Sequence, residues 1–240
     1  MYLSWIILSE NYKKFITLEQ VKEKLKILKG SIVEINELNN DNLLKQSAVM
    51  VLIYPFKGES FSLILTKRNS KLKKHSGEIS FPGGKVDRNK DKNKIDTALR
   101  ECAEEIGVNP IDIEVLGVLE EVNTLTGFNI TPIVGVLKHQ IEFKINTDEV
   151  SKLLIVPIEP FLDVKSFKEN VVDMQGIKMP IYNFDYVDED GIKHSIWGVT
   201  AHIIVKLINI LYNINLSKIQ LERPPKEKIL KILSSGLNNE

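Results

Sequence analysis

The residues best suited to chemistry are three glutamates close together in the chain. Glu101, Glu104 and Glu105 stand three and four residues apart, which brings them near one another on a helix. Like charges at this spacing repel by about 0.2 to 0.5 kcal/mol per pair, so a purely structural helix does not benefit from them. Carboxylate oxygens are the ligands that Mg²⁺ and Mn²⁺ prefer, together with water and substrate phosphates. The segment is therefore a candidate divalent-metal site, and a solvated acidic surface is the alternative.

The helix that must position these glutamates is visible in its apolar pattern. Five residues recur at helical spacing and form one stripe that we expect to face the core, namely Ile95, Ala98, Leu99, Cys102 and Ile106. The glutamates are expected on the opposite face, with Arg100 beside them. Asn93 or Asp96 is a candidate N-cap, and Gly107 is a natural C-terminal cap. The sequence thus predicts a short helix with one buried face and one carboxylate face.

This segment and the glycine pair Gly83-Gly84 resemble the Nudix box. Its pattern is a glycine, five residues, a glutamate, seven residues, and then Arg-Glu-apolar-any-Glu-Glu-any-Gly-apolar. Every position of the second half is met from Arg100 onward, but Lys90 stands where the first glutamate is expected. Arg100 also lies two positions later than the strict pattern allows. Asp91 is the nearest acid and could substitute for that glutamate if the loop before the helix contains the extra residues. Longer loops cost little additional closure entropy.

Other blocks resemble one branch of that family, the coenzyme A pyrophosphatase-type proteins. Residues 65–84 are similar to the branch signature, which begins Leu-Thr-any-Arg and ends Phe-Pro-Gly-Gly, and residues 119–134 and 196–201 also agree. Asn69 stands where serine or alanine is usual, and Lys73 where arginine is usual. Lysine keeps the charge but loses the bidentate geometry of arginine. The likeness runs through most of the chain.

The resemblance implies a fold and an activity. The fold is α+β, a Nudix-type mixed β-sheet sandwiched between helices, which also fits the mixed order of strands and helices. The activity is a metal-dependent pyrophosphatase using Mg²⁺ or Mn²⁺, which splits the diphosphate of coenzyme A or acyl-CoA into 4′-phosphopantetheine and adenosine 3′,5′-bisphosphate. Hydrolysis of another nucleoside diphosphate derivative (ADP-ribose, a dinucleotide or a nucleoside triphosphate) is the alternative. A non-catalytic nucleotide-sensing domain is the competing class, although a binding module does not need three converging carboxylates.

The resemblance also implies roles for residues at the metal. Glu101 and Glu105 are the surest ligands, and Glu104 is either a ligand or the base. A backbone carbonyl of the glycine pair, assigned to Gly84, could complete the coordination, because glycine lets the backbone approach closely. Arg100 is expected to orient a glutamate by a charge-assisted hydrogen bond.

Further residues are candidates for substrate contacts. Arg68 and Lys73 are candidate phosphate contacts, in a lysine-rich run that a solvated loop would explain equally well. Gly83 is expected beside the substrate, and Phe81 is a candidate for the pocket wall, although aromatic residues next to strands are usually core. Glu149 is a candidate for an additional acid from a later loop, with Glu120 and Glu121 behind it, and each of these three is otherwise a surface charge.

The composition limits the classes of protein to which the chain can belong. The chain has 240 residues, 43% of them hydrophobic, with a formal net charge of zero and a pI near 6.9, so we expect no nucleic-acid binding through bulk charge. The single cysteine, Cys102, excludes an intramolecular disulfide and favours a reducing compartment. The N-terminus does not resemble a secretory signal, and the apolar run 199–216 is interrupted by polar residues, His202 among them. We therefore expect a cytoplasmic protein that is not inserted in a membrane.

The remaining pattern predicts elements and domain limits. Helices are expected over 18–28, 199–212 and 225–233, and strands over 47–56, 61–67, 79–81, 113–121, 130–137 and 154–157, with a hairpin turn at 188–191. We divide the chain into an N-terminal helical extension (1–45), a Nudix hydrolase domain (46–216) and a C-terminal helical extension (217–240). The extensions are candidates for covering the core or for pairing two subunits into a homodimer.

Overall fold

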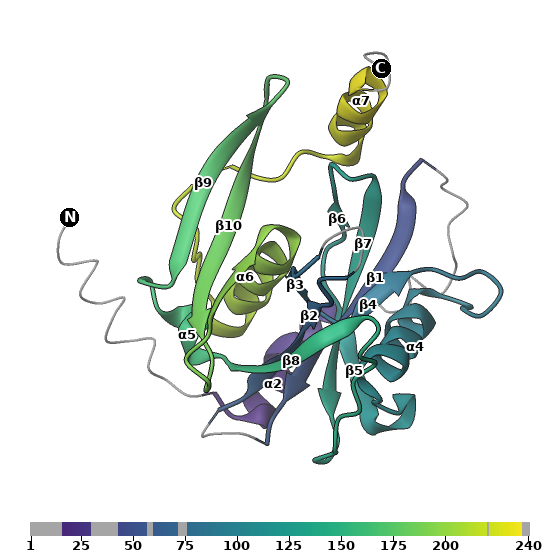
Figure 1. Cartoon of the computed structure of the whole chain (residues 1–240). Coiled ribbons are helices and arrows are strands. Elements are labelled where there is room, and N and C mark those ends of the chain that lie inside the picture. Colours follow the sequence, from purple (N-terminus) through teal and green to yellow (C-terminus); the bar gives the residue numbers. More distant parts are fainter. Residues whose placement is uncertain (1–15, 30–42, 57–59, 72–75, 220, 237–240) are drawn as a thin grey trace.

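A mixed β-sheet forms the centre of the computed structural model, which describes residues 16–29, 43–56, 60–71, 76–219 and 221–236 (Figure 1). The sheet has eight strands in the order β3-β2-β1-β7-β5, with β4 also pairing with β1, β6 with β7 and β8 with β2. Their bounds are β1 Lys45–Tyr54, β2 Ser62–Arg68, β3 Ile79–Ser80, β4 Gly83–Lys85, β5 Ile113–Val118, β6 Val122–Asn123, β7 Phe128–Leu137 and β8 Val150–Pro157. The β1–β7 pair is parallel and the other pairs are antiparallel.

Helices cover both faces of this sheet: α2 Leu18–Leu25 and α6 Gly198–Tyr212 lie on one face, and α4 Lys94–Ile106 lies on the other (Figure 1). The helix α5 Glu159–Leu162 packs against α6, and α7 Lys226–Gly236 lies at the top of Figure 1, near the C-terminus. Short 3₁₀ turns occur at Lys26–Leu28 and Pro110–Asp112. Alternate residues of β1 point to opposite faces: Val51 and Ile53 join the buried cluster that contains α2 and α6, whereas Met50 and Leu52 join the cluster that contains α4. The predicted α+β architecture with helices on both faces is therefore confirmed.

A second sheet of three strands was not anticipated as a unit. It consists of β9 Phe167–Met174, β10 Ile177–Val187 and β11 Lys193–Trp197 in the order β11-β10-β9. The predicted turn at 188–191 lies between β10 and β11. Strand β9 was missed because most of its residues are exposed and polar residues are mixed irregularly with apolar ones, so it carries little of the apolar alternation that marks a half-buried strand.

The other predicted elements agree with the structure within a few residues. The expected helix over 18–28 is α2 followed by a 3₁₀ turn, and Thr17 and Gln20 form a capping box at its start. Val21 and Leu25 of α2 are fully buried in the same cluster as α6, so this helix packs against the sheet.

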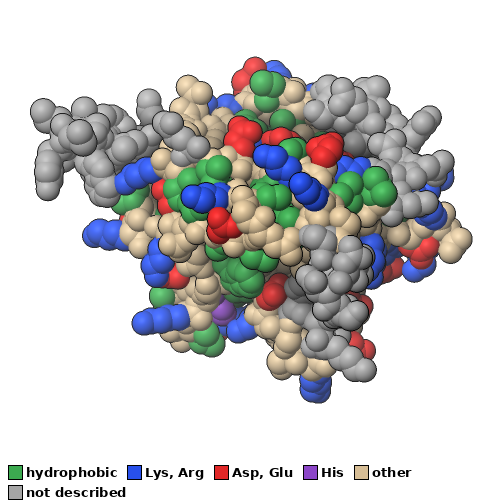
Figure 2. Space-filling view, turned by 90° about the horizontal axis from the view of Figure 1, so that it is seen from above, with side chains coloured by type: hydrophobic (Ala, Val, Ile, Leu, Met, Phe, Trp, Pro, Cys, Tyr) green, Lys and Arg blue, Asp and Glu red, His purple; other side chains and the backbone are tan. Residues whose placement is uncertain are grey.

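The surface carries charges of both signs close together. On the face shown in Figure 2, Lys and Arg side chains alternate with Asp and Glu, and apolar groups lie between them. This distribution agrees with the formal net charge of zero. No helix among the described residues combines the length and the apolar character that crossing a bilayer requires.

Candidate functional site

Helix α4 positions the glutamates, and its ends are fixed as the sequence predicts. The Asn93 side chain accepts a hydrogen bond from the backbone N–H of Asp96 at 2.9 Å, which identifies Asn93 as the N-cap. Gly107 ends the helix in the left-handed conformation with φ 72°. Ala98 and Cys102 are fully buried against β1, so the helix is held to the sheet along its apolar face.

The three glutamates do not share one exposed face. The side chains of Glu101 and Glu104 are 14% and 47% exposed, whereas Glu105 is only 4% exposed. The expectation that all three lie opposite the buried stripe is therefore wrong for Glu105. Position 105 follows Cys102 by three residues and Ala98 by seven, which places it at the edge of the buried stripe rather than across from it.

Glu105 is a buried carboxyl group in a mixed electrostatic environment. Its pKa is raised to about 8, mainly by burial and also by the charges of Glu101 and Glu149, whereas Arg68 and the backbone N–H of Gly83 act in the opposite direction. Its Oε2 is buried and has no hydrogen-bond partner in the described part of the chain. The structure thus brings Glu101, Arg68, Glu149 and Gly83 together around Glu105.

Glu101 lies directly against Gly84. A Cβ atom placed on Gly84 would be 2.3 Å from Oε1 of Glu101, so only glycine leaves room for this carboxylate. Burial raises the pKa of Glu101, although Arg100 opposes the shift with a hydrogen bond from Nη1 at 2.8 Å. The carbonyl oxygen of Gly84 accepts a hydrogen bond from the Ser47 hydroxyl at 2.9 Å, which fixes the orientation of that carbonyl.

Asp91 pairs with Arg100. Its carboxylate accepts hydrogen bonds from Nε and Nη2 of Arg100 at 2.8 and 2.9 Å, from the Thr97 hydroxyl at 2.8 Å and from the backbone N–H of Asp87 at 2.8 Å. Burial alone would raise the pKa of Asp91, but these hydrogen bonds outweigh it and hold the pKa below its usual value. Arg100 also donates to Glu104 at 2.9 Å, so one guanidinium links Asp91 to two of the glutamates. Sequence reasoning left the role of Asp91 open, and this geometry identifies its partner.

The loop that carries Glu149 is held by a residue that sequence reasoning treated only as a departure from a pattern. Asn69, next to Arg68, donates its backbone N–H to the carbonyl of Glu149 at 2.8 Å and its side-chain amide to the carbonyl of Thr147 at 2.7 Å. The N–H of Asn146 donates to the carbonyl of Glu105 at 2.9 Å. The loop is therefore fastened to both β2 and α4. A polar residue at a strand end was the only sequence signal for this contact.

Several predicted residues lie elsewhere. Phe81 is 2% exposed and belongs to the core cluster of α6, which agrees with the alternative that it is a core residue and leaves its place in the pocket wall a prediction. Lys73 lies outside the described residues. Glu120 pairs with Lys206 at 2.8 Å and Glu121 pairs with Lys94 at 2.5 Å, so each of these acids has its own basic partner.

The donor set suits a divalent cation, although its side chains are not yet arranged around one. Within the described ranges, no three carboxylate, histidine or cysteine side chains converge so as to hold a metal ion as they stand. The partnerless Glu105 oxygen, the neighbouring Glu101 carboxylate and the Gly84 carbonyl are nevertheless hard oxygen donors with excess negative charge. This chemistry fits Mg²⁺ or Mn²⁺, and ligation requires side chains of the cluster to rotate.

Comparisons with known proteins find a family model, relatives and a solved structure that match this chain. The sequence model described as the NUDIX domain matches residues 44–170. "Uncharacterized Nudix hydrolase NudL" from Pectobacterium atrosepticum is 34% identical over 165 residues, which cover 68% of this chain and 81% of that protein. "Nudix hydrolase 15, mitochondrial" from Arabidopsis thaliana is 34% identical over 183 residues, covering 75% of this chain and 60% of that protein. A crystal structure of a MutT/nudix family protein from Enterococcus faecalis covers 92% of this chain and 81% of its own, at 17% identity and a TM-score of 0.44.

Proposed function

Because the chain belongs to the Nudix hydrolase family, we propose that it cleaves the diphosphate of coenzyme A or an acyl-CoA into 4′-phosphopantetheine and adenosine 3′,5′-bisphosphate. Nudix hydrolases act on pyrophosphate bonds of small nucleotide derivatives and generally use divalent metal ions. The observation that carries the proposal is the buried carboxyl of Glu105, which lies among Glu101, Glu149 and Arg68. Arg68 also belongs to the sequence block that is similar to the coenzyme A branch.

The side chains divide the work of the proposed reaction. The ion would be held by Glu101, Glu105 and the Gly84 carbonyl, and Glu104 is a further candidate ligand. When bound, the ion would neutralise phosphate charge and make an attacking water more acidic. Arg68 supports the proposal because its Nε is buried without a partner in the described chain, ready to donate to a phosphate oxygen.

Proton transfer and positioning fall to neighbouring groups. Arg100 holds Glu101 in place, and its own position is fixed by Asp91. Glu104 and Glu149 are the candidate carboxylates to accept the proton of the attacking water. Glu104 is held by Arg100, and Glu149 raises the pKa of both Glu101 and Glu105.

For the compartment, we propose the cytoplasm, although the Arabidopsis relative is named mitochondrial.

The substrate assignment can be tested with a matched set of diphosphates. Coenzyme A, dephospho-coenzyme A, ADP-ribose, a dinucleotide and a nucleoside triphosphate are each incubated with Mg²⁺ or Mn²⁺, and the products are separated by chromatography. We expect the two named products from coenzyme A. We also expect kcat/KM to be about 10- to 100-fold lower without the 3′-phosphate, since a hydrogen bond to a charged group contributes about 1.5 to 3 kcal/mol. Absence of both products under every metal condition would remove the substrate assignment, and faster cleavage of ADP-ribose would favour the alternative.

The glycine pair provides a second test, because its two members meet different neighbours. In Gly84→Ala the new Cβ meets the Glu101 carboxylate at 2.3 Å, the mobile end of a side chain, so we expect an intact fold and about 10²-fold lower kcat/KM from the displaced carboxylate. In Gly83→Ala the Cβ meets the Ala48 carbonyl oxygen at 2.5 Å and the Val49 Cα at 2.6 Å. Because this backbone lies within the sheet, we expect a lower melting temperature there.

Thermal unfolding and steady-state kinetics on both glycine variants separate the two effects. Wild-type turnover in Gly84→Ala would show that the Glu101 carboxylate does not need its present position. An unchanged melting temperature in Gly83→Ala would show that β1 and β4 can separate without cost.

A further inference from the structure

We propose that a cavity beside α6, apart from the glutamates of α4, is a second anion site that binds a phosphate monoester through Arg223 and His202. The Arg223 cavity, as we call it, has a volume of about 980 Å³. Its polar lining includes Asn123, Tyr182, His202, Lys206, Asn209 and Arg223. The volume is at the upper end of the range for small-molecule sites, which is roughly 300 to 1,000 Å³, so it can hold more than an isolated ion.

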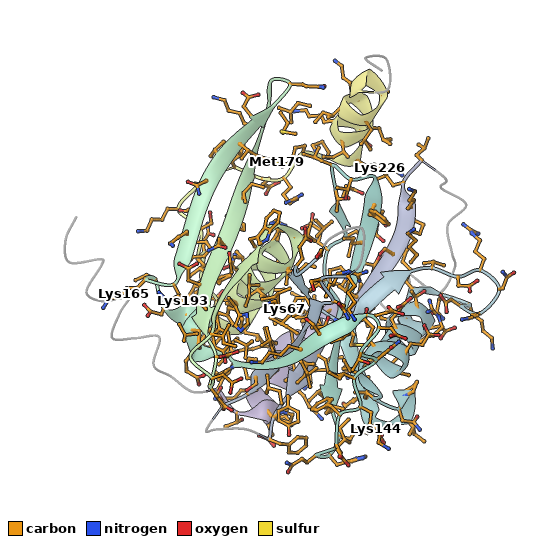
Figure 3. All side chains as sticks on the ribbon, in the orientation of Figure 1. Lys67, Lys144, Lys165, Met179, Lys193 and Lys226 are labelled. Carbon is orange, nitrogen blue, oxygen red and sulfur yellow. The ribbon has the colours of Figure 1, made fainter. Side chains whose placement is uncertain are left out.

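The cavity accounts for the polar residues that interrupt the apolar run of α6. His202, Lys206 and Asn209 lie at spacings of four and three residues, on one face of the helix, and that face lines the cavity. The opposite wall is the segment that carries Arg223 and leads into α7 at Lys226; Met179 of β10 and Lys226 are labelled on either side of it in Figure 3. Segments far apart in the sequence therefore bring their polar groups to one space.

Two side-chain nitrogen atoms of residues that line this cavity have no hydrogen-bond partner in the described chain. They are Nε of Arg223 and Nδ1 of His202, and both are buried. Nη2 of Arg223 makes only a long contact of 3.5 Å with the backbone carbonyl of Asn123. Because a desolvated cation without a counter-charge is costly, this arrangement favours an anion that both nitrogen atoms can reach.

His202 lies between a stacked ring and the charge of Arg223. His202 stacks on Tyr182 with ring centroids 5.8 Å apart and planes within 4° of parallel. The pKa of His202 is lowered to about 3, mainly by burial, and the charges of Arg223 and Lys206 act in the same direction. The imidazole is thus neutral and can donate from Nδ1, while the charge of the site comes from the arginine.

The acids at the cavity do not neutralise Arg223. Glu120 pairs with Lys206 at 2.8 Å, and Glu121 accepts hydrogen bonds from Lys94, Thr131 and Asn129. Glu222 is exposed, and within the described residues no ion pair joins it to Arg223. The counter-charge is therefore expected from a ligand, and the planar guanidinium fork suits the paired oxygens of a phosphate.

Calorimetric titration in EDTA tests this site without a contribution from metal at the glutamates. The probes are inorganic phosphate, adenosine 3′,5′-bisphosphate and adenosine, which distinguish a free phosphate ion from a nucleotide-borne phosphate and from binding of the base. We expect saturable binding of at least one phosphate probe and none of adenosine. Arg223→Met should weaken that binding by about 10- to 100-fold, since a hydrogen bond to a charged group contributes about 1.5 to 3 kcal/mol.

Three variants serve as controls. Arg88→Met removes an exposed arginine outside the cavity and should bind as the wild type does. Glu105→Gln should also bind normally, which separates this site from the proposed reaction. Arg223→Lys keeps the positive charge but loses the bidentate hydrogen-bonding geometry of the guanidinium, so we expect intermediate affinity and an intact fold. No binding of either phosphate probe to the wild type, equal binding of adenosine, or unchanged affinity in Arg223→Met would each overturn the proposal.

Discussion

Glu105→Gln is expected to lower kcat by about 10²- to 10⁴-fold, the range typical for loss of one catalytic polar group. The substitution keeps the size of the side chain but removes the negative charge next to Glu101 that we expect to hold the cation. We expect the loss to appear in kcat and kcat/KM together, at saturating Mn²⁺ as well as Mg²⁺. Unchanged turnover would contradict the assigned site and would favour the non-catalytic class of Nudix domain.

The same variant should be as stable as the wild type or more stable. Oε2 of Glu105 has no hydrogen-bond partner in the described chain, and the group is buried beside other carboxylates, so ionisation of this carboxyl opposes folding when no cation is present. Urea unfolding in EDTA measures this directly. Glu142→Gln, at an exposed position, is the matched control and should change neither turnover nor stability. A clear loss of stability in Glu105→Gln alone would mean that the carboxylate is structural.

Asp91→Ala should cause the largest loss of stability, about 3 to 5 kcal/mol in the free energy of unfolding, because the part-buried guanidinium of Arg100 loses the carboxylate that binds its Nε and Nη2. The Asp91 side chain is 1% exposed and accepts four hydrogen bonds, two of them from Arg100. Activity should also fall, because Arg100 would no longer be fixed beside Glu101 and Glu104. Urea unfolding and kinetics on the same preparations test both effects. A stability loss below about 1 kcal/mol would show that the pair contributes no more than a surface ion pair.

The same carboxylate gives a pH dependence with a definite sign. Because the folded-state pKa of Asp91 is below its unfolded value, its stabilising contribution is present above the usual pKa near 4 and is lost as the pH falls through the folded pKa. Asp91→Asn should therefore lose less stability than the wild type on acidification below about pH 4. Asp148→Asn, at an exposed position, serves as the control and should follow the wild-type profile. Parallel profiles for wild type and Asp91→Asn would contradict the assignment.

The sequence predicted well those features that depend on local pattern. Helix α4, its Asn93 cap and its Gly107 end follow from spacing and side-chain type within a few residues of chain. The depth of Glu105 was missed because a helix has no sharp boundary between faces, and a residue at the edge of the stripe can be buried by the strand it faces. Strand β9 was missed because it is stabilised by pairing with β10 and not by an apolar face.

Contacts between distant segments could not be predicted from one sequence. Asn69 and Thr147 are 78 residues apart, and Arg223 and Asn123 are 100 residues apart, so no local period connects them. The family pattern indicated Asp91 only as a possible substitute for the missing glutamate, because its four hydrogen bonds depend on how the loop before α4 turns back. The general rule is that residue types indicated the chemistry, and the sheet topology decided which of them meet.

The parallel pairing of β1 with β7 has a consequence for synthesis. Lys45 pairs with Phe128 at the start of this ladder, so the middle strand of the sheet lacks one neighbour until more than half of the chain has been translated. Strand β8, which follows Glu149 directly and ends at Pro157, arrives later still. Closing such long loops costs conformational entropy before the contacts between strands can stabilise the fold. The glutamates and their neighbours are therefore not expected to assemble piece by piece on the ribosome. Cation capture should therefore be a late event of biogenesis, after the chain has left the exit tunnel beyond β8.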